Sequence, residues 1–267
     1  MNNAFSVFSP QQWQVMRALG QYRFLTVDQM LRLGISKSAY SLRDKTLFAL
    51  RHHDCIHSEK IGSFLPDMHH LTPHGQAFLN QLEPWHTVSA PSNKRTPFSA
   101  LFAQHRFAQV DFHIGLSQWA EKRGDIDILL AQQDFVRTAR ENGQNVKSAT
   151  ELNVPTLAKP VVPDGIFAIN VHVTGKIAVY LVEVHRSTQT KAVTEQLANY
   201  FEVIKHAIIQ ETLGYPVHPI VCSIHHQPSV LENTKQRLMV MPEFEPFKRN
   251  FVFHALDDLN SNFAGGW

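Results

Sequence analysis

Residues 161–188 read VVPDGIFAINVHVTGKIAVYLVEVHRST and predict a β-hairpin. Apolar and β-branched residues fill two runs, 164–169 and 177–184, as they do in buried strands. Thr174-Gly175 lies between the runs, and glycine supplies the backbone freedom that a tight turn needs. The sequence therefore places two neighbouring antiparallel strands inside a sheet.

Two carboxylates lie at the open end of this hairpin. Asp164 begins the first strand and Glu183 lies near the end of the second, so the hairpin brings them side by side at one edge of the sheet. Side chains alternate between the two faces of a strand, hence Glu183 and His185 project the same way. Because hard divalent cations prefer oxygen ligands, we expect Asp164 and Glu183 to bind Mg²⁺ or Mn²⁺. Such a cation lowers the pKa of bound water and stabilises charge on a scissile phosphate.

Helical and strand patterns alternate on both sides of the hairpin. Helices are expected over residues 98–119, 188–210 and 229–240, and strands over residues 126–130, 219–224 and 251–255. With the hairpin included, the order is α, β, β, β, α, β, α, β. That order predicts an α/β (α+β) domain with a mixed sheet flanked by helices.

The N-terminal part of the chain is expected to form a separate domain. Residues 83–97 contain three prolines and several Ser, Thr and Asn with little periodic hydrophobicity, which is typical of a linker. The boundary divides the chain into a first domain, 1–82, and a second domain, 98–267.

The first domain begins with three short helical patterns. Ser9, Thr26 and either Ser36 or Ser38 precede these patterns as capping residues. The second and third patterns are separated by only three residues, beginning with Gly34. This is the spacing of a helix-turn-helix.

Two short strands and a closing helix follow, over residues 55–61, 68–71 and from 71 onward. Residues 10–82 resemble winged helix-turn-helix domains, many of which end in the Leu-Thr-x-x-Gly step found at residues 71–75. The resemblance implies binding of double-stranded DNA. The side chains expected to face a groove are Lys37, Ser38, Tyr40, Ser41, Arg43, Lys45 and, on the wing, Lys60. The alternative is that these charges only solvate a protein-interaction domain.

The carboxylate pattern of the second domain resembles the PD-(D/E)XK nuclease superfamily. Asp164 follows a proline, and Glu183-x-His185 takes the place of Glu-x-Lys. Gln196 and Tyr200 match a Gln-x-x-x-Tyr pattern found in some branches. The resemblance implies a restriction-endonuclease-like fold, with catalytic roles for the Asp, the Glu, the residue in the lysine position and the Gln.

One position departs from that pattern, because His185 stands where the superfamily has lysine. A neutral imidazole cannot supply the positive charge of an ammonium. His185 can instead bind the metal or accept a proton, and Lys191 can supply the missing charge. Otherwise the site is inactive and the fold remains as a DNA-binding platform.

Motifs along nearly the whole chain resemble the replication-relaxation family and the related MOBC relaxases. After the winged-helix pattern these motifs are Gln104–Ala108, Pro163–Gly165 and Val182–Thr188. The resemblance implies a plasmid protein that nicks DNA at a transfer or replication origin, with other relaxosome proteins or a coupling protein as partners. His105 and Tyr200 are candidates to support the site. The rival function is a non-catalytic relaxosome accessory or a transcription regulator.

Simpler structural roles exist for each candidate residue of the second domain. Asp164 can bond local amides, and Glu183 can pair with a nearby Lys or Arg. His105 can be a core histidine bonded to a backbone carbonyl, and Tyr200 can pack against the sheet.

Composition restricts the class of protein. The 267 residues carry a net charge of +2, with 10 Lys and Arg against 6 Asp and Glu in residues 1–97 (+4) and 15 against 17 in residues 98–267 (−2). No run of 18 apolar residues and no secretory signal is found, so we expect a cytoplasmic protein without a membrane span. Two cysteines cannot form a four-ligand zinc site or a disulfide framework.

Overall fold

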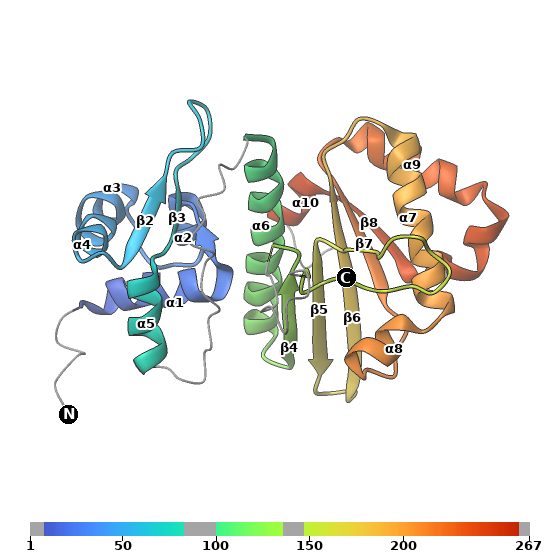
Figure 1. Ribbon diagram of the computed structural model, residues 1–267, viewed down its shortest axis with the longest axis horizontal. Coiled ribbons are helices and arrows are strands. Elements are labelled where there is room, and N and C mark those ends of the chain that lie inside the picture. The colour runs from blue at the N-terminus through green and yellow to red at the C-terminus, as the bar shows by residue number, and fades with distance from the viewer. Residues whose placement is uncertain (1–7, 83–99, 136–146, 262–267) are drawn as a thin grey trace. The chain divides into compact units, whose positions relative to one another are not determined.

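The computed structural model describes residues 8–82, 100–135 and 147–261, and Figure 1 shows its helices and strands. The chain forms two compact units, Met1–Ile114 and Gly115–Trp267, and the boundary falls within one helix, α6 (Ala100–Arg123). The fold is mixed α/β, with one sheet of three strands and one of five. The predicted linker, 83–97, lies outside the described residues.

Helices with side-chain caps open the first unit. Its first helical segments are α1 (Pro10–Tyr22), α2 (Val27–Arg32), α3 (Ala39–Ser41), the π-helical η2 (Leu42–Leu47) and α4 (Phe48–His52). Ser9 and Thr26 each accept a hydrogen bond from the third residue of their helix, which returns one as a capping box. Ser38, and not Ser36, caps the third helix. The expected caps are therefore confirmed, whereas the π-helical turns were not expected.

A small antiparallel sheet follows these helices. The strands are β1 (Phe24–Leu25), β2 (Ile56–Glu59) and β3 (Met68–Leu71), in the order β1-β3-β2, and α5 (Pro73–Leu82) comes after them. Strands β2 and β3 are the two that the sequence predicted. The third strand, β1, is too short to leave a pattern in the sequence.

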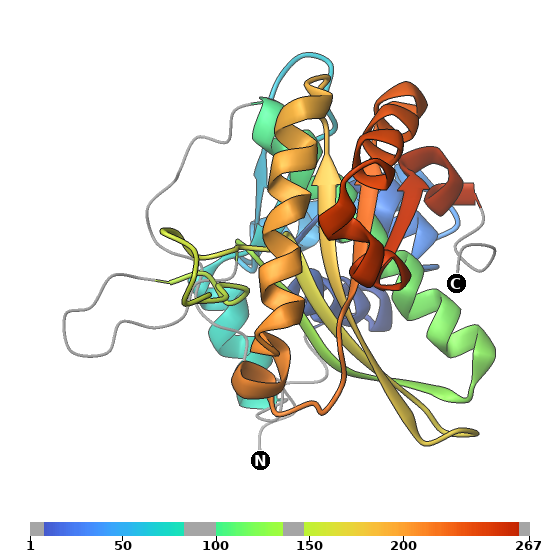
Figure 2. The ribbon, with the colours of Figure 1, turned by 90° about the vertical axis from the view of Figure 1, so that its right-hand side faces the viewer.

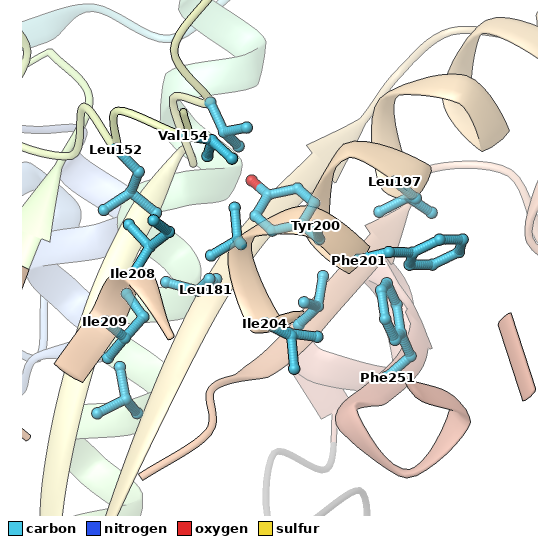
Figure 3. Packing of buried hydrophobic residues seen from close by; sticks show 14 of the residues in the cluster. Leu152, Val154, Leu181, Leu197, Tyr200, Phe201, Ile204, Ile208, Ile209 and Phe251 are labelled. Atoms are coloured by element: carbon cyan, nitrogen blue, oxygen red, sulfur yellow. The ribbon is translucent and has the colours of Figure 1, made fainter. Parts of the chain in front are cut away.

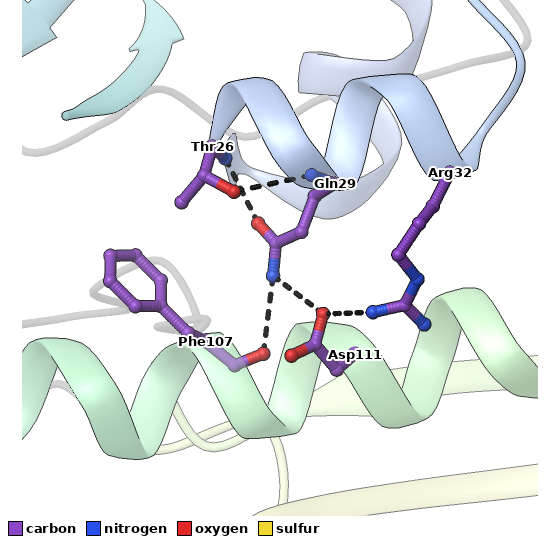
Figure 4. Close-up of polar contacts among 5 residues, drawn as sticks. All are labelled: Thr26, Gln29, Arg32, Phe107 and Asp111. Carbon is purple, nitrogen blue, oxygen red and sulfur yellow. Dashed lines mark hydrogen bonds and ion pairs between the residues drawn. The ribbon is translucent and has the colours of Figure 1, made fainter. Parts of the chain in front are cut away.

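A polar cluster attaches α2 to α6 within the first unit (Figure 4). The Nε2 of Gln29 donates to Asp111 Oδ1 at 2.9 Å and to the carbonyl oxygen of Phe107 at 3.2 Å. Arg32 Nη1 donates to the same Asp111 oxygen at 2.8 Å. Burial raises the pKa of Asp111, and the bonds from Gln29 and Arg32 oppose that shift. The part of α6 around Phe107 and Asp111 therefore belongs to the first unit's structure.

Asp111→Ala is expected to lower the free energy of unfolding by about 1 kcal/mol, because a part-buried carboxylate that accepts two bonds is lost. Chemical denaturation of the whole protein measures this. Glu195→Ala is the control, since it breaks an ion pair with Lys191 in which both side chains are well exposed, and it should cause no measurable change. Equal effects of the two substitutions would contradict the structural role of Asp111.

The second unit is built on the five-stranded sheet. Its strands are β4 (Ile126–Gln133), β5 (Gly165–Val171), β6 (Lys176–His185), β7 (Ile220–His225) and β8 (Phe251–Ala255), in the order β4 to β8. The pairs β4-β5 and β5-β6 are antiparallel, whereas β6-β7 and β7-β8 are parallel. The predicted hairpin is confirmed as β5-β6, and the sheet is mixed as expected.

Helix α7 (Thr190–Lys205) lies along one face of this sheet (Figure 2). Its apolar side chains pack on strand residues of that face to form the core (Figure 3). The chain continues through α8 (Ile208–Leu213), α9 (Pro228–Met239), the 3₁₀ segment η3 (Pro242–Asn250) and α10 (Leu256–Ser261).

The helix expected over residues 188–210 is broken, and that expectation was wrong in this detail. Ala207 has a φ of 52°, a left-handed conformation that ends α7 before α8 begins. The apolar pattern continues through Ile208 and Ile209, both buried, so it gave no signal of the break.

Candidate functional site

The structure brings Asp164 and Glu183 together at the open end of the β5-β6 hairpin. Gly165 pairs with Val182, so the two carboxyl residues are the next neighbours across the strands. The backbone N–H of Val184 donates to Asp164 Oδ2 at 2.7 Å. Asp164 thus bonds across the hairpin, and both carboxylates are buried.

Two side chains of α7 hold the carboxylate of Glu183. Gln196 Nε2 donates to one oxygen at 2.8 Å, and the hydroxyl of Tyr200 donates to the other. Glu183 is only 3% exposed, but Gln196 belongs to the exposed surface. The buried carboxylate is therefore bonded to a side chain that itself reaches the surface.

The electrostatics of Glu183 are unfavourable to its charged form. Burial raises the pKa of Glu183 well above its usual value, and the neighbouring charge of Asp164 raises it further. The bonds from Tyr200 and Gln196 only partly oppose these effects. Within the described part of the chain, Glu183 has no cationic side chain as a partner. The anticipated pairing with a Lys or Arg is not present there.

Three polar residues beside this pair were not predicted. Ser223 and His225 on β7 lie next to Glu183 and His185 in the register, and the two imidazole rings are 4.9 Å apart. The Ser223 Oγ and His225 Nε2 are 2.8 Å apart. Burial lowers the pKa of His225 to about 4. Asp134, directly after β4, also raises the pKa of Glu183 by its charge.

The sequence held only a weak signal for these residues. Ser223 lies in the strand predicted over residues 219–224, but His225 falls just after its predicted end. Alternation places the two on one face only if the strand continues to His225, and it names no partner for either. Their proximity to Glu183 depends on the parallel pairing of β6 with β7.

Two further predicted residues lie on helices α7 and α6. Lys191 lies on the exposed side of α7, where its Nζ is 3.8 Å from Glu195 Oε1. His105 is half-buried on α6 in the first unit. The described contacts of Lys191 therefore give it no part in the carboxylate cluster.

The donor chemistry of the pair fits Mg²⁺ or Mn²⁺. Among the residues that the structure describes, no group of three or more His, Cys, Asp and Glu gathers as a metal-binding cluster. Mg²⁺, however, commonly keeps several waters and takes only one or two carboxylates from the protein. Two adjacent buried carboxylates, Asp164 and Glu183, satisfy that requirement.

The predicted DNA-contacting residues of the first unit lie at its surface. Exposed side chains are those of Lys37, Ser38, Tyr40, Arg43, Lys45 and Lys60, and Ser41 is half-exposed. Leu42, Leu47 and Leu50 form the buried side of the same helical segment, as expected. This segment thus has one apolar face inside and one polar face toward solvent.

A family model for replication-relaxation proteins matches residues 16–216. The chain belongs to the replication-relaxation family. The matched range covers both the helices of the first unit and the strands and helix that carry Asp164, Glu183, Gln196 and Tyr200. No curated protein and no solved structure matches the chain. Membership suggests a role in plasmid replication or mobilisation, and therefore an involvement with DNA.

None of the described helices combines the length and the apolar character needed to cross a membrane.

Proposed function

We propose that this replication-relaxation protein binds a plasmid origin through a winged helix and nicks it with a divalent metal held by Asp164 and Glu183. The observation that carries the proposal is the pair of adjacent buried carboxylates. Burial and mutual repulsion make two such groups costly, and a bound cation would offset that cost.

The first unit supports the DNA-binding part of the proposal. Helices α1, α2 and α3-η2-α4, followed by the β2-β3 hairpin and α5, have the order of a winged helix-turn-helix. Three of the predicted cations are exposed to solvent here: Arg43 and Lys45 on the third helical segment, and Lys37 just before its N-cap, Ser38. That segment would read the duplex, with Lys60 on the wing.

The second unit supports the nuclease part. The order of three antiparallel strands, two helices and a parallel strand is compatible with a PD-(D/E)XK core, which the sequence motifs imply. The acidic residues lie at one end of the central hairpin, and the Gln-x-x-x-Tyr residues bond to Glu183. The relationship to MOBC relaxases belongs to the same proposal.

Each residue of this site has a distinct expected role. Asp164 and Glu183 would hold the cation, which when bound supplies activated water and stabilises charge on phosphate. Gln196 and Tyr200 orient the Glu183 carboxylate by donating one hydrogen bond to each oxygen. His185, on the same face, would accept a proton or act as a further ligand.

The direct test is conversion of a supercoiled plasmid that carries the cognate origin to its nicked form. Nicking is expected with Mg²⁺ or Mn²⁺, and none is expected with EDTA. Absence of both nicking and calorimetric metal binding would refute the enzymatic function. It would favour a non-catalytic accessory or regulator, for which His185 in the lysine position is the supporting observation.

The DNA-binding part has its own test. Lys37→Ala, Arg43→Ala and Lys45→Ala should each weaken origin-duplex binding, and removal of a cation that touches a phosphate should reduce the salt slope by about one unit. Fluorescence anisotropy at several salt concentrations measures both quantities. Lys176→Ala, exposed at the turn end of β5-β6, is the control of equal charge change. Unchanged binding in all three variants would exclude the third helix as the DNA-contacting segment.

A further inference from the structure

Three aromatic side chains are unusually exposed within residues 8–82 of the first unit. Tyr40 is 71% exposed, Phe48 59% and Phe64 100%, and they are the large exposed hydrophobic side chains within residues 8–82. Tyr40 lies on α3, Phe48 begins α4, and Phe64 lies in the turn between β2 and β3. All three therefore belong to the helical segment and hairpin to which the proposed function assigns DNA contact.

Cations lie between these aromatic residues in the sequence. Residues 37–52 contain four Lys and Arg and one Asp, a net charge of +3 with histidines neutral. Arg43 and Lys45 lie between Tyr40 and Phe48, and all of these side chains are exposed. The positive charge of this surface complements the phosphates of a nucleic acid. The aromatic side chains can contact its bases instead.

The end of the helical segment lies against the hairpin. Arg51 Nη1 near the end of α4 donates to Ser58 Oγ on β2 at 3.2 Å. Ser58 in turn lies 2.7 Å from the Nδ1 of His69 on β3. Both Arg43 and Arg51 are close enough to His69 to lower its pKa by their charge. The cations of the helix thus lie beside the strands that lead to Phe64.

The chemistry of exposed aromatics among cations fits unpaired bases. Aromatic side chains stack on base faces, and cations follow the phosphates. In a duplex the base faces are covered by their neighbours, so a groove-reading helix gains little from three exposed rings. When the bases are unpaired, each of the three aromatic side chains can stack on a base.

We propose that the surface formed by residues 37–52 and the β2-β3 turn binds DNA with unpaired bases, through stacking on Tyr40, Phe48 and Phe64. This inference rests on the proposed DNA-binding function and specifies the form of DNA that the surface takes. A protein with this preference holds an origin open where one strand must become accessible. Specificity for unpaired bases resides in the rings, and affinity for phosphate resides in the cations.

The test compares one origin sequence as duplex, as a duplex with an internal unpaired bubble, and as a single strand. Tyr40→Ala, Phe48→Ala and Phe64→Ala are each expected to weaken bubble and single-strand binding roughly 5- to 100-fold. For Phe48→Ala and Phe64→Ala, duplex binding should change less than about twofold, because no base face is available. Tyr40 is also a predicted groove contact, so Tyr40→Ala should weaken bubble binding more than duplex binding. A 2-aminopurine base in the bubble should show a stacking-dependent fluorescence change with the wild-type protein that each variant reduces.

Matched substitutions separate stacking from other causes. Phe48→Leu keeps apolar area but removes the ring, and it should lose binding as the alanine variant does. Phe102→Ala removes an aromatic side chain of similar exposure, 61%, on α6 and should have no effect. Thermal unfolding checks that the variants are folded. They are expected to fold because the replaced side chains are exposed.

Several results would overturn the inference. Equal losses for duplex and bubble would mean general groove contact, and retained binding in Phe48→Leu would mean apolar contact without stacking. If the aromatic variants abolish a concentration-dependent dimer in light scattering but leave DNA binding unchanged, the surface binds a second copy of the chain and not DNA. If the aromatic variants are silent while Arg43→Ala weakens duplex binding, this inference fails and the proposed function stands. If neither set affects any DNA, both fail.

Discussion

Glu183→Gln is expected to reduce metal-dependent nicking of origin DNA by about 100-fold or more, with duplex affinity changed by less than about twofold. A metal ion provides several kcal/mol of transition-state stabilisation, so loss of an anionic ligand should have an effect of this order. Gln retains the shape of Glu and can still accept from Gln196 or Tyr200. DNA contact is assigned to the other unit and should not change. Asp164→Asn should behave in the same way.

Glu195→Gln provides the matched control for the cleavage experiment. It removes one negative charge from α7, at an exposed position where the partner is Lys191. Nicking and metal affinity should remain at the wild-type level. Calorimetric titration with Mn²⁺ distinguishes lost metal binding from a lost later step. Full activity in both Glu183→Gln and Asp164→Asn would place the chemistry elsewhere in the protein.

Much of the second unit could be predicted because its signals are local. Alternating and apolar runs identified β5 and β6, and Gly175, with a φ of 61°, forms the predicted turn. Since a hairpin has only one simple pairing, the proximity of Asp164 and Glu183 followed from sequence. The four-residue spacing of Gln196 and Tyr200 likewise placed them on one helix face, where both bond to Glu183.

The unpredicted features depend on long-range pairing or on backbone strain. Ser223 and His225 lie at the site because β7 pairs with β6 in parallel. Two helices, α7 and α8, separate these strands in the chain. Asp134 reaches it through the pairing of β4 with β5. Neither register can be read from periodicity within a strand. The left-handed Ala207 depends on packing that favours a break despite its local cost.

Glu183→Gln is also expected to make the metal-free protein more stable, increasingly so at higher pH. The folded-state pKa of Glu183 is raised above its unfolded value by burial and by the charge of Asp164. For a carboxyl group with a raised pKa, the stability present below the unfolded pKa, about 4.3 for Glu, is lost as pH rises through the folded-state pKa. The neutral amide of Gln has no such loss.

Urea unfolding in EDTA should therefore give a small difference between variant and wild type near pH 4.5, and a stabilisation on the order of 2 kcal/mol near pH 8. Glu195→Gln, at an exposed position, should show no such trend. A pH-independent difference would mean that charge at Glu183 is not the cause. Added Mn²⁺ should stabilise the wild type selectively and so reduce the difference, because only the carboxylate provides an anionic ligand. Glu183→Gln would then raise the stability of the metal-free protein and lower metal-dependent nicking. Opposite changes of this kind are expected when two repelling carboxylates are retained because they bind a cation, at a cost in stability.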